Sequence, residues 1–521
     1  MHLIDEPWIP IRRVSGKTEL IRPAQIAKSD DPAVVLTSPR ADFNGALAQF
    51  LIGLLQTTFA PRNDDEWAQF LDQPPTVKAL EESFAKVTHA FQLDGNGARF
   101  MQESSLLNEN FDRRTIDNWL IEVNEDHFNK RGRIKQLCPP CTAIALFSHQ
   151  INAPEGGRGH FTSLRGGGPL TTLVIAEKHG PNGAENLWHD LWRNVLDQTE
   201  FPIPTTDEAF CQTFPWLTSD RFIKASIGRP VYPDDFHPCH YYWSMSKRFW
   251  LETPVTEKGA CHLCGARGQI FYSSYATRPN GIQYDKGPLW QHPLSPYKKK
   301  GKAEDLLVEH PRRGGVTYRH WLGYSYSDSR SQTLNAKVVA TFLNSNRKLE
   351  EEQFQLWAFG YDMKSNKARC WYETNLPLYL IPEAIRETFS NRVGNLIEAA
   401  EYVADLLKRQ IKQAWFKRPR DIRGDVSFLA DGFYQHTEGN FYTCAHDLIQ
   451  AIPEDTDYDI LARWHRIVVK AAFDLFDEWT TAGDIAFSDP RRIAQARDSL
   501  RKGLYQDGEK LRFNSPYPIA G

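Results

Sequence analysis

Apolar side chains recur at helical spacing over the last third of the chain. The clearest series comprises Leu396, Ala400, Val403, Leu407 and Ile411. Two similar series cover residues 461–479 and 493–504, and a weaker one, interrupted near Gly439, covers 426–450. Because positions three and four apart share one face of a helix, each series predicts a helix with one buried face. Four such helices joined by short polar connections predict a four-helix bundle over residues 381–521.

The first 380 residues lack this regularity. Pro7 and Pro10 flank an apolar pair, which favours an extended or edge strand, and a helical apolar series begins at Ala46 behind a candidate N-cap, Asp42. Further along, the apolar segments are short and are interrupted by Gly, Pro and Asn. We therefore expect an α+β fold, in which a large, irregular mixed α/β domain over residues 1–380 precedes the helix bundle.

Composition limits the classes of function. The 521 residues are 41% hydrophobic and 12% aromatic, which is typical of a globular protein. With 62 basic and 65 acidic side chains the formal charge is −3, so any contact with nucleic acid must come from local patches. The chain has no run of 18 apolar residues and its first residues lack a secretory pattern, so we expect a cytoplasmic protein without membrane contact.

Four of the eight cysteines form two Cys-x-x-Cys pairs. They are Cys138 with Cys141, and Cys261 with Cys264. This spacing lets one turn present two thiolates, and two such pairs complete a closed tetrahedral zinc site. Since 119 residues separate the pairs, such a site connects distant segments of the chain. Redox-active cysteine pairs are the alternative interpretation.

The other candidate ligands are weaker. His237, Cys239 and His240 offer a substitute ligand or form an ordinary loop, and the unpaired cysteines are interpreted as small buried apolar residues. Four cysteine ligands leave no position for a water molecule, so the predicted zinc is structural. The sequence contains no Walker loop, no His-Glu-x-x-His and no Gly-x-Ser-x-Gly, so no motif promotes an enzymatic activity.

Three segments carry candidate nucleic-acid contacts. Residues 153–169 contain six glycines and two arginines, a composition that lets backbone amides approach a phosphate or a base edge. Residues 127–135 interleave a phenylalanine and an asparagine with four cations, and residues 298–302 with Arg312 and Arg313 form a second basic cluster. Each segment is equally consistent with a solvent-exposed loop.

Distinctive motifs follow one another through nearly the whole chain. They are Leu3-Ile4-Asp5 with Trp8, Ser38-Pro39-Arg40, Cys141 to Phe147, Leu164-Arg165-Gly166-Gly167, Trp290 with His292-Pro293, and Gly360-Tyr361. In this order they resemble the CasA family, the large subunits of the type I-E CRISPR surveillance complex Cascade. The resemblance implies a subunit without catalytic activity that recognises the protospacer-adjacent motif (PAM) in duplex DNA and promotes strand opening and R-loop formation. It also implies the other Cascade subunits, crRNA, target double-stranded DNA and a recruited helicase-nuclease as partners.

The resemblance assigns roles to individual residues on both sides of the cysteine pairs. His127, Phe128 and Asn129 stand in a loop that the family associates with the 5′ end of the crRNA and with neighbouring subunits. A lysine finger follows the second cysteine pair in the family. Here Arg278 is the nearest match, with Lys286 as the alternative, and a cation entering a narrow groove suits either position.

The family's glycine loop, whose backbone approaches the minor groove of the PAM, falls between the two pairs. Gly156, Gly157 and Gly159 occupy this loop, while Glu155 and Arg158 stand where the family pattern has glycine. We expect the backbone at Gly157 and Gly159 to make the contact.

The family's duplex-opening wedge follows the Gly-Tyr motif and often carries a glutamine at its tip. The corresponding segment has no glutamine, and Asn366 and Lys367 are the candidate tip residues. Two other functions stay open. One is a zinc-dependent nucleic-acid-processing enzyme with His237 or His240 as a metal ligand, and the other is a purely scaffolding subunit without DNA contact.

Overall fold

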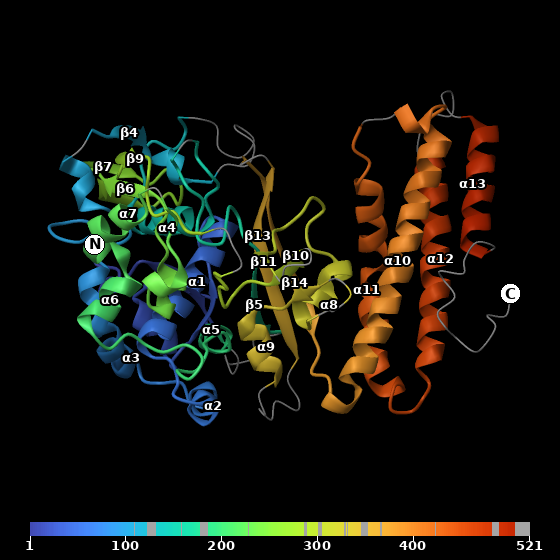
Figure 1. Ribbon diagram of the computed structural model, residues 1–521, viewed down its shortest axis with the longest axis horizontal. Coiled ribbons are helices and arrows are strands. Elements are labelled where there is room, and N and C mark those ends of the chain that lie inside the picture. The colour runs from blue at the N-terminus through green and yellow to red at the C-terminus, as the bar shows by residue number, and fades with distance from the viewer. Residues whose placement is uncertain are drawn as a thin grey trace. The chain divides into compact units, whose positions relative to one another are not determined.

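The computed structural model divides the chain into two compact units (Figure 1). Unit 1 comprises Met1–Arg312 and Ser329–Asn375, and unit 2 comprises Arg313–Asp328 and Leu376–Gly521. The structure describes residues 1–108, 110–121, 132–157, 159–177, 186–227, 229–285, 289–300, 305–327, 330, 332–344, 353–364, 367–421, 424–481 and 489–505. A single boundary near residue 380 places residues 313–328 in the first domain, whereas in the structure they belong to unit 2.

The core of unit 1 surrounds helix α1 (Ala41–Thr58), which is buried at almost every position. A helix that is apolar on all sides is stable only when other elements enclose it. The ring of Phe50 makes T-shaped contacts with the rings of Trp8, Phe91, Phe100, Phe147 and Trp243. Helix α4 (Pro139–Asn152) packs directly against α1, so the element that follows the first cysteine pair is fixed to the centre of the core.

The first turn of α1 differs from the sequence expectation. The N-cap is Arg40, and Asp42, the predicted N-cap, lies inside the helix. The Asp42 carboxylate is buried and accepts hydrogen bonds from the Arg40 guanidinium at 2.8 and 3.0 Å and from the Tyr361 hydroxyl at 2.5 Å. The Asp42 carboxylate, which local capping rules assign to the end of the helix, therefore binds the distant Tyr361 instead.

Shorter helices and small sheets complete unit 1. The helices are α2 (Asp64–Asp72), α3 (Val77–Phe84), α5 (Leu187–Trp192), α6 (Asp207–Thr213), α7 (Ser219–Ala225) and α9 (Lys337–Asn344). One sheet has the order β2 (Thr18–Ile21), β1 (Ile9–Arg13), β3 (Ala33–Leu36). The extended segment predicted around Pro10 is confirmed as β1, but this strand is central and not at an edge. Pro10 lacks an N–H, and its carbonyl accepts from Thr37 N at 2.9 Å.

The remaining strands lie closer to the candidate site residues. A second sheet has the order β4 (Asp112–Thr115), β9 (Ser274–Arg278), β6 (Arg248–Leu251), and β7 (Val255–Ala260) pairs with β8 (Arg267–Phe271). A third has the order β14 (Lys367–Leu378), β13 (Phe354–Lys364), β5 (Thr171–Ala176). A fourth has the order β11 (Asp305–Val308), β10 (Tyr297–Lys300), β12 (Thr333–Leu334). Cross-strand pairing thus joins segments that are far apart in sequence.

In the described part of unit 2, four long helices run side by side (Figure 1). They are α10 (Arg386–Trp415), α11 (Phe428–Ala451), α12 (Asp457–Thr481) and α13 (Pro490–Tyr505). Helix α10 packs against each of the other three, and the predicted apolar series from Leu396 to Ile411 forms its buried face. The weak series becomes one continuous helix, α11, which passes through Gly439 without the predicted interruption. None of the described helices has the length and apolar character needed to span a membrane.

Part of the segment 313–327 lies in the core of unit 2. The segment contains a short 3-10 turn and helix α8 (Trp321–Ser325). The ring of Tyr318 stacks on Phe441 at 4.3 Å between centroids and meets Trp464 edge-on, and the Trp321 indole N–H donates to the carbonyl of Pro377 at 2.6 Å. These aromatic side chains are buried, so this part of the segment fills the core instead of passing over the surface.

Candidate metal centre and nucleic-acid interface

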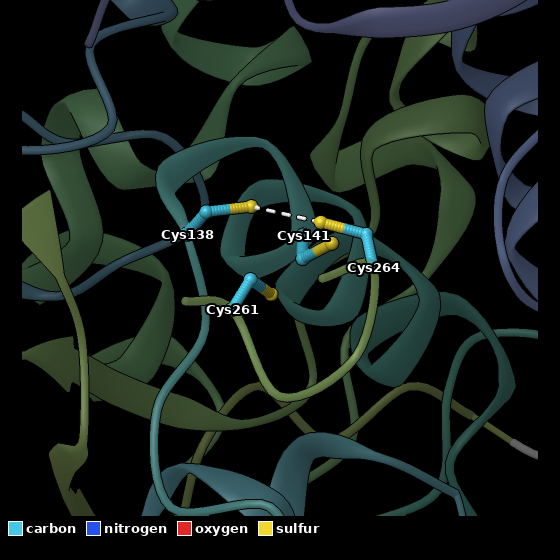
Figure 2. A group of neighbouring side chains, drawn as sticks. All are labelled: Cys138, Cys141, Cys261 and Cys264. Carbon is cyan, nitrogen blue, oxygen red and sulfur yellow. Dashed lines mark hydrogen bonds between the residues drawn. The ribbon is translucent and has the colours of Figure 1, made fainter. Parts of the chain in front are cut away.

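The four paired cysteines lie together in the structure (Figure 2). Their sulfur atoms all fall within 4.8 Å of one another, and the Sγ atoms of Cys138 and Cys264 are 3.6 Å apart. A tetrahedral site with Zn–S bonds of about 2.3 Å has sulfur-to-sulfur edges of about 3.8 Å. Cys138, Cys141 and Cys261 are buried while Cys264 is exposed, and all four thiols are free. The arrangement fits a four-thiolate metal ion.

Backbone pairing brings the two cysteine turns together. Cys138 is the N-cap of α4, and Cys261 and Cys264 lie in the turn between β7 and β8. Leu137 and Tyr272 exchange two backbone hydrogen bonds of 2.9 Å each, and His262 N donates to the Gln136 carbonyl at 3.1 Å. The predicted link between distant segments is therefore already present in the backbone around the sulfur atoms.

The electrostatics of the cluster favour a bound cation. Hydrogen bonds from Cys138 and Cys141 lower the pKa of Cys261. Hydrogen bonding to Cys138 and Cys261 together with burial raises the pKa of Cys141. The two pKa values shift in opposite directions, and four thiolates in this space would repel one another without a cation at their centre.

The alternative ligands are engaged elsewhere. His240 is buried, with Nε2 2.9 Å from the Tyr284 hydroxyl and Nδ1 3.2 Å from the Thr213 carbonyl oxygen, and Cys239 Sγ donates to the Pro202 carbonyl at 3.3 Å. His237 Nδ1 accepts from the backbone N–H of Cys239. Among the described residues, the four paired cysteines form the group suited to a metal. Of the unpaired cysteines, two differ from the expectation of full burial, because Cys211 and Cys370 are half-buried.

The glycine loop directly follows α4, and few backbone hydrogen bonds join its described residues to one another. Gly156 N donates to the His160 carbonyl and His160 N donates to the Gly157 carbonyl, both at 3.0 Å. Gly157 and Gly159 have φ values of +99° and +80°, which side chains disfavour. A Cβ at Gly157 meets nothing within 4 Å, so this part of the loop backbone is open.

The turn that follows β9 packs against the same loop. Asn280 N donates to the Gly159 carbonyl at 2.7 Å, and a Cβ at Gly159 lies 2.8 Å from Cβ of Pro279. Arg278 is the last residue of β9 and is half-buried. The glycine loop and the candidate cation Arg278, which the sequence indicated separately, therefore lie on neighbouring segments. We refer to residues 154–160 and 278–280 together as the loop pair.

The cysteine cluster and the loop pair share their supporting elements. Helix α4 begins at the first cysteine turn and leads into the glycine loop, while β8 follows the second cysteine turn and continues through β9 to Arg278. The two elements that carry the loop pair therefore each start beside one of the two cysteine turns.

This chain matches the family of the CRISPR-associated protein Cse1 over residues 2–475. The chain belongs to the Cse1 family. This is the CasA family of type I-E Cascade large subunits that the motifs resemble.

Solved structures share the fold of this Cse1-family chain. Cse1 from Thermobifida fusca superposes with a TM-score of 0.69 at 16% identity, covering 97% of this chain and 98% of the other. Cse1 from Acidimicrobium ferrooxidans gives 0.67 at 16% identity, with 97% of both chains covered. A chain of a structure described as a CRISPR RNA-guided surveillance complex gives 0.64 at 14% identity, covering 97% and 99%.

Several residues that the family resemblance assigns lie outside the described part of this Cse1-family chain. They are His127, Phe128, Asn129, Asn366, and the secondary candidates Arg158 and Lys286. Lys367 is described as the first residue of β14 and is exposed. The two elements that carry these candidates meet in one small core, formed by Ile121, Tyr361 and Ala368 with Met363, Cys370 and Trp371. Ile121, the last described residue before 132, therefore packs against β13 and β14.

Sequence reasoning did not identify Lys247, and it gave Asp42 a different role, that of a helix N-cap. Lys247 lies under the glycine loop, and the Asp42 carboxylate accepts a hydrogen bond from the hydroxyl of Tyr361 in β13. Neither belongs to a recognisable motif, because each acts through partners about 90 or more residues away in the chain. The structural role of a buried polar residue can be recognised only after its surroundings in the fold are known.

Proposed function

We propose that this Cse1-family chain is the Cascade subunit that recognises the PAM in double-stranded target DNA, promotes strand opening and R-loop formation, and helps to recruit the helicase-nuclease. Its proposed partners are the other Cascade subunits and the crRNA, and it catalyses no reaction itself. Family membership over residues 2–475 supports this assignment, as does the likeness of its fold to chains of CRISPR RNA-guided surveillance complexes.

The observation that carries the proposal is the loop pair. Open glycine backbone at Gly157 lets a groove edge approach without a side chain between, and the neighbouring Arg278 supplies a cation. A narrow minor groove concentrates negative potential and attracts arginine. The loop pair thus combines a backbone surface with a positive charge, which is the combination that PAM contact through the minor groove needs.

Strand opening is proposed for the connection between β13 and β14, with Asn366 and Lys367 at its tip. Separating stacked base pairs costs roughly a few kcal/mol per step, so a wedge must be rigidly supported. Support comes from the Tyr361 hydroxyl bound to the buried Asp42 carboxylate, and from the Arg369 guanidinium, which donates to Asp362 at 2.6 Å across the two strands. The exposed Lys367 leaves a positive charge at the start of β14.

The remaining assignments follow the family. Residues 127–129 are proposed to contact the crRNA 5′ end and a neighbouring subunit. Helices α10–α13 are proposed to be the family's four-helix bundle, which takes part in recruiting the helicase-nuclease. The four-cysteine cluster is proposed to hold a structural zinc ion, since its ligands are all thiolates and leave no position for a reacting water molecule.

A matched pair of glycine variants tests PAM recognition. Gly157 and Gly97 have φ values of +99° and +96°, and an added Cβ meets nothing within 4 Å at either. Alanine therefore costs the same backbone strain at both positions, about 1–2 kcal/mol. We expect Gly157→Ala to weaken binding of the assembled complex to a PAM-containing duplex about tenfold, and Gly97→Ala to leave it unchanged.

The assay compares the equilibrium affinity of the assembled complex for duplexes with the PAM intact or scrambled. Equal affinity of the wild-type complex for both duplexes would favour the scaffolding alternative. Turnover of a nucleic-acid substrate that disappears in Cys261→Ser, with the fold retained, would favour the zinc-dependent enzyme.

A further inference from the structure

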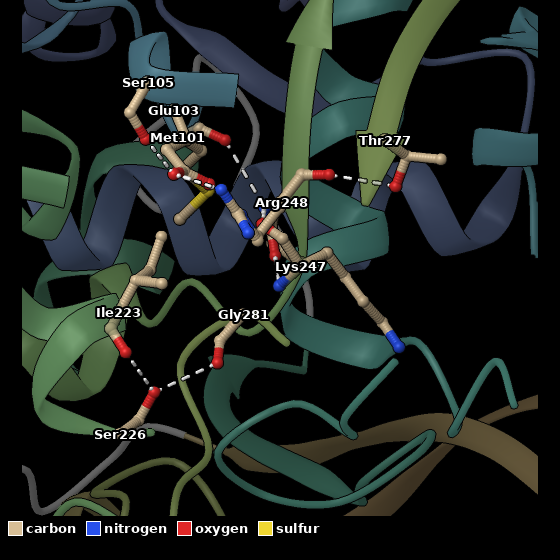
Figure 3. A network of polar contacts seen from close by, with 10 residues as sticks. Met101, Glu103, Ser105, Ile223, Ser226, Lys247, Arg248, Thr277 and Gly281 are labelled. Carbon is tan, nitrogen blue, oxygen red and sulfur yellow. Dashed lines mark hydrogen bonds and ion pairs between the residues drawn. The ribbon is translucent and has the colours of Figure 1, made fainter. Parts of the chain in front are cut away.

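Lys247 is a buried lysine just before β6, and its side chain points away from that of its neighbour. Figure 3 shows Arg248 directed at Glu103 and Lys247 directed at the opposite side. The Arg248 guanidinium and the Glu103 carboxylate form a buried ion pair, at 2.5 Å from Nε and 2.9 Å from the second nitrogen. Residues 247 and 248 therefore serve two separate purposes, since successive side chains of an extended chain face opposite ways.

The ammonium group of Lys247 joins the two ends of the glycine loop. Nζ donates to the Pro154 carbonyl at 3.0 Å and to the His160 carbonyl at 3.1 Å. The residue is only 4% exposed. No described carboxylate lies within ion-pair distance of Nζ. The ammonium group therefore donates to carbonyls of the loop and forms no salt bridge with the described residues.

The lysine is itself held by helix α4. The Gln150 side chain accepts from Lys247 N and donates to the Lys247 carbonyl, each at 3.0 Å. Gln150 is buried in α4, the helix that leads into the loop. The ammonium is therefore fixed relative to the point where the loop begins.

The loop needs such a contact because its own backbone restrains it weakly. Only two backbone hydrogen bonds, between Gly156 and His160 and between His160 and Gly157, lie within residues 154–160 of the described chain. Glycine loses more conformational freedom on ordering than any other residue. Hydrogen bonds from a charged donor are about twice as strong as neutral ones.

We propose that Lys247 is a positioning residue for PAM recognition: its ammonium clamps residues 154 and 160 and so holds the open backbone at Gly157 in the conformation that meets DNA. The inference rests on the proposed function of the loop pair. Lys247 itself is buried beneath the loop and does not reach the duplex.

The clamp has a pH signature. Burial lowers the pKa of Lys247 to about 8, against the attraction of Glu155, so the clamp loses its charge in mildly alkaline solution. The neighbouring histidines do not share this range. Burial lowers the pKa of His149 to about 3, and burial and the Lys247 charge lower that of His160. Both are therefore neutral where Lys247 titrates, and the other charged side chains that act on His160 are Arg114 and Asp112.

Hydrogen exchange of the isolated full-length chain tests the clamp without DNA. Lys247→Met keeps most of the buried stem but removes the donor, and Lys247→Arg keeps a cation. We expect amides of residues 153–161 to exchange about tenfold faster in Lys247→Met, with α4 unchanged, and Lys247→Arg to restore part of the protection. Lys78→Met, which removes an exposed lysine from α3, is the matched control and is expected to exchange like wild type.

Binding of the assembled complex tests the consequence for DNA. We expect Lys247→Met to lose about tenfold in affinity for the PAM duplex and little for the scrambled duplex, and Lys78→Met to lose nothing. Between about pH 7 and 9, the PAM preference of wild type is expected to decline, and that of Lys247→Arg to stay constant.

The outcomes separate the inference from the function beneath it. Unchanged loop exchange in Lys247→Met, or full PAM preference in that variant, overturns the role of Lys247. A wild-type complex without PAM preference overturns the proposed function instead, and the exchange experiment still reports whether the clamp exists.

Discussion

Removing one cysteine ligand is expected to destabilise unit 1 by a definite amount. Cys264→Ser is the best perturbation, because Cys264 is the exposed member of the cluster and its replacement creates no cavity. Serine is a poor zinc ligand at neutral pH, so the variant opens the site without disturbing the packing around it. Cys211→Ser, at a half-buried cysteine in α6 outside the cluster, is the matched control.

The magnitude follows from the length of chain that the metal closes. The two cysteine turns enclose 119 residues, and closing a loop of that length restricts the unfolded chain by about 5 kcal/mol in the chain-entropy treatment of cross-links. For a unit of this size, that loss corresponds to a fall in Tm on the order of 10 °C. Cys138, Cys141 and Cys261 remain in this variant and still come from both turns, so the figure is an upper bound.

The assay combines metal content with thermal unfolding. Wild type and Cys211→Ser are expected to carry about one zinc ion per chain and to melt together, while Cys264→Ser and chelator-treated wild type melt earlier. Identical melting of Cys264→Ser and Cys211→Ser, or of metal-free and metal-loaded wild type, would refute the reasoning. A melting temperature that responds to reductant but not to chelator would point to the redox interpretation of the cysteine pairs.

Three further predictions concern other parts of the chain. Arg278→Ala is expected to reduce the slope of log affinity against log salt by about 1 in the assembled complex, measured on the PAM duplex, and an unchanged slope would remove Arg278 from the interface. Tyr361→Phe removes the hydroxyl that donates a hydrogen bond to the Asp42 carboxylate. We expect the free energy of unfolding in urea to fall by about 1–3 kcal/mol, and wild-type stability would contradict this. Trp321→Ala empties a fully buried site and is expected to cost unit 2 about 3–5 kcal/mol, seen by calorimetry as an earlier transition. If residues 313–328 packed loosely, that transition would not move.

The long helices could be predicted from sequence because their apolar period is sustained. The series from Leu396 to Ile411 marks the buried face of α10 without reference to any other element. Helix α11 was harder, since glycine lowers helix propensity and the segment around Gly439 carries few apolar residues. Packing against α10 and α12 overrides that local weakness. Residues 313–328 could not be assigned, because their aromatic residues pack on helices that come more than 60 positions later.

The candidate site was predictable only where spacing carries chemistry. Two Cys-x-x-Cys pairs announce a shared site, and the structure places all four sulfur atoms together. Glycine content and a family resemblance indicated the glycine loop and Arg278, but their contact through Asn280 N and the Gly159 carbonyl depends on the pairing of β6 with β9. Lys247 gave no signal at all, since a lysine beside an arginine reads as surface charge until its burial is known.

Unit 2 is built from two segments that are separated in the chain, and this affects the order in which its parts are synthesised. Tyr318 and Trp321 leave the ribosome well before Phe441 and Trp464, the rings against which unit 2 later buries this segment. At about 5–20 residues per second, roughly 9–35 s pass between the appearance of residue 328 and that of residue 505. During that interval the nascent chain carries the aromatic segment 313–328, which belongs to unit 2 and not to unit 1. Chaperones that bind exposed apolar segments are therefore expected to engage residues 313–328, and a message truncated before α12 yields a chain that never releases them.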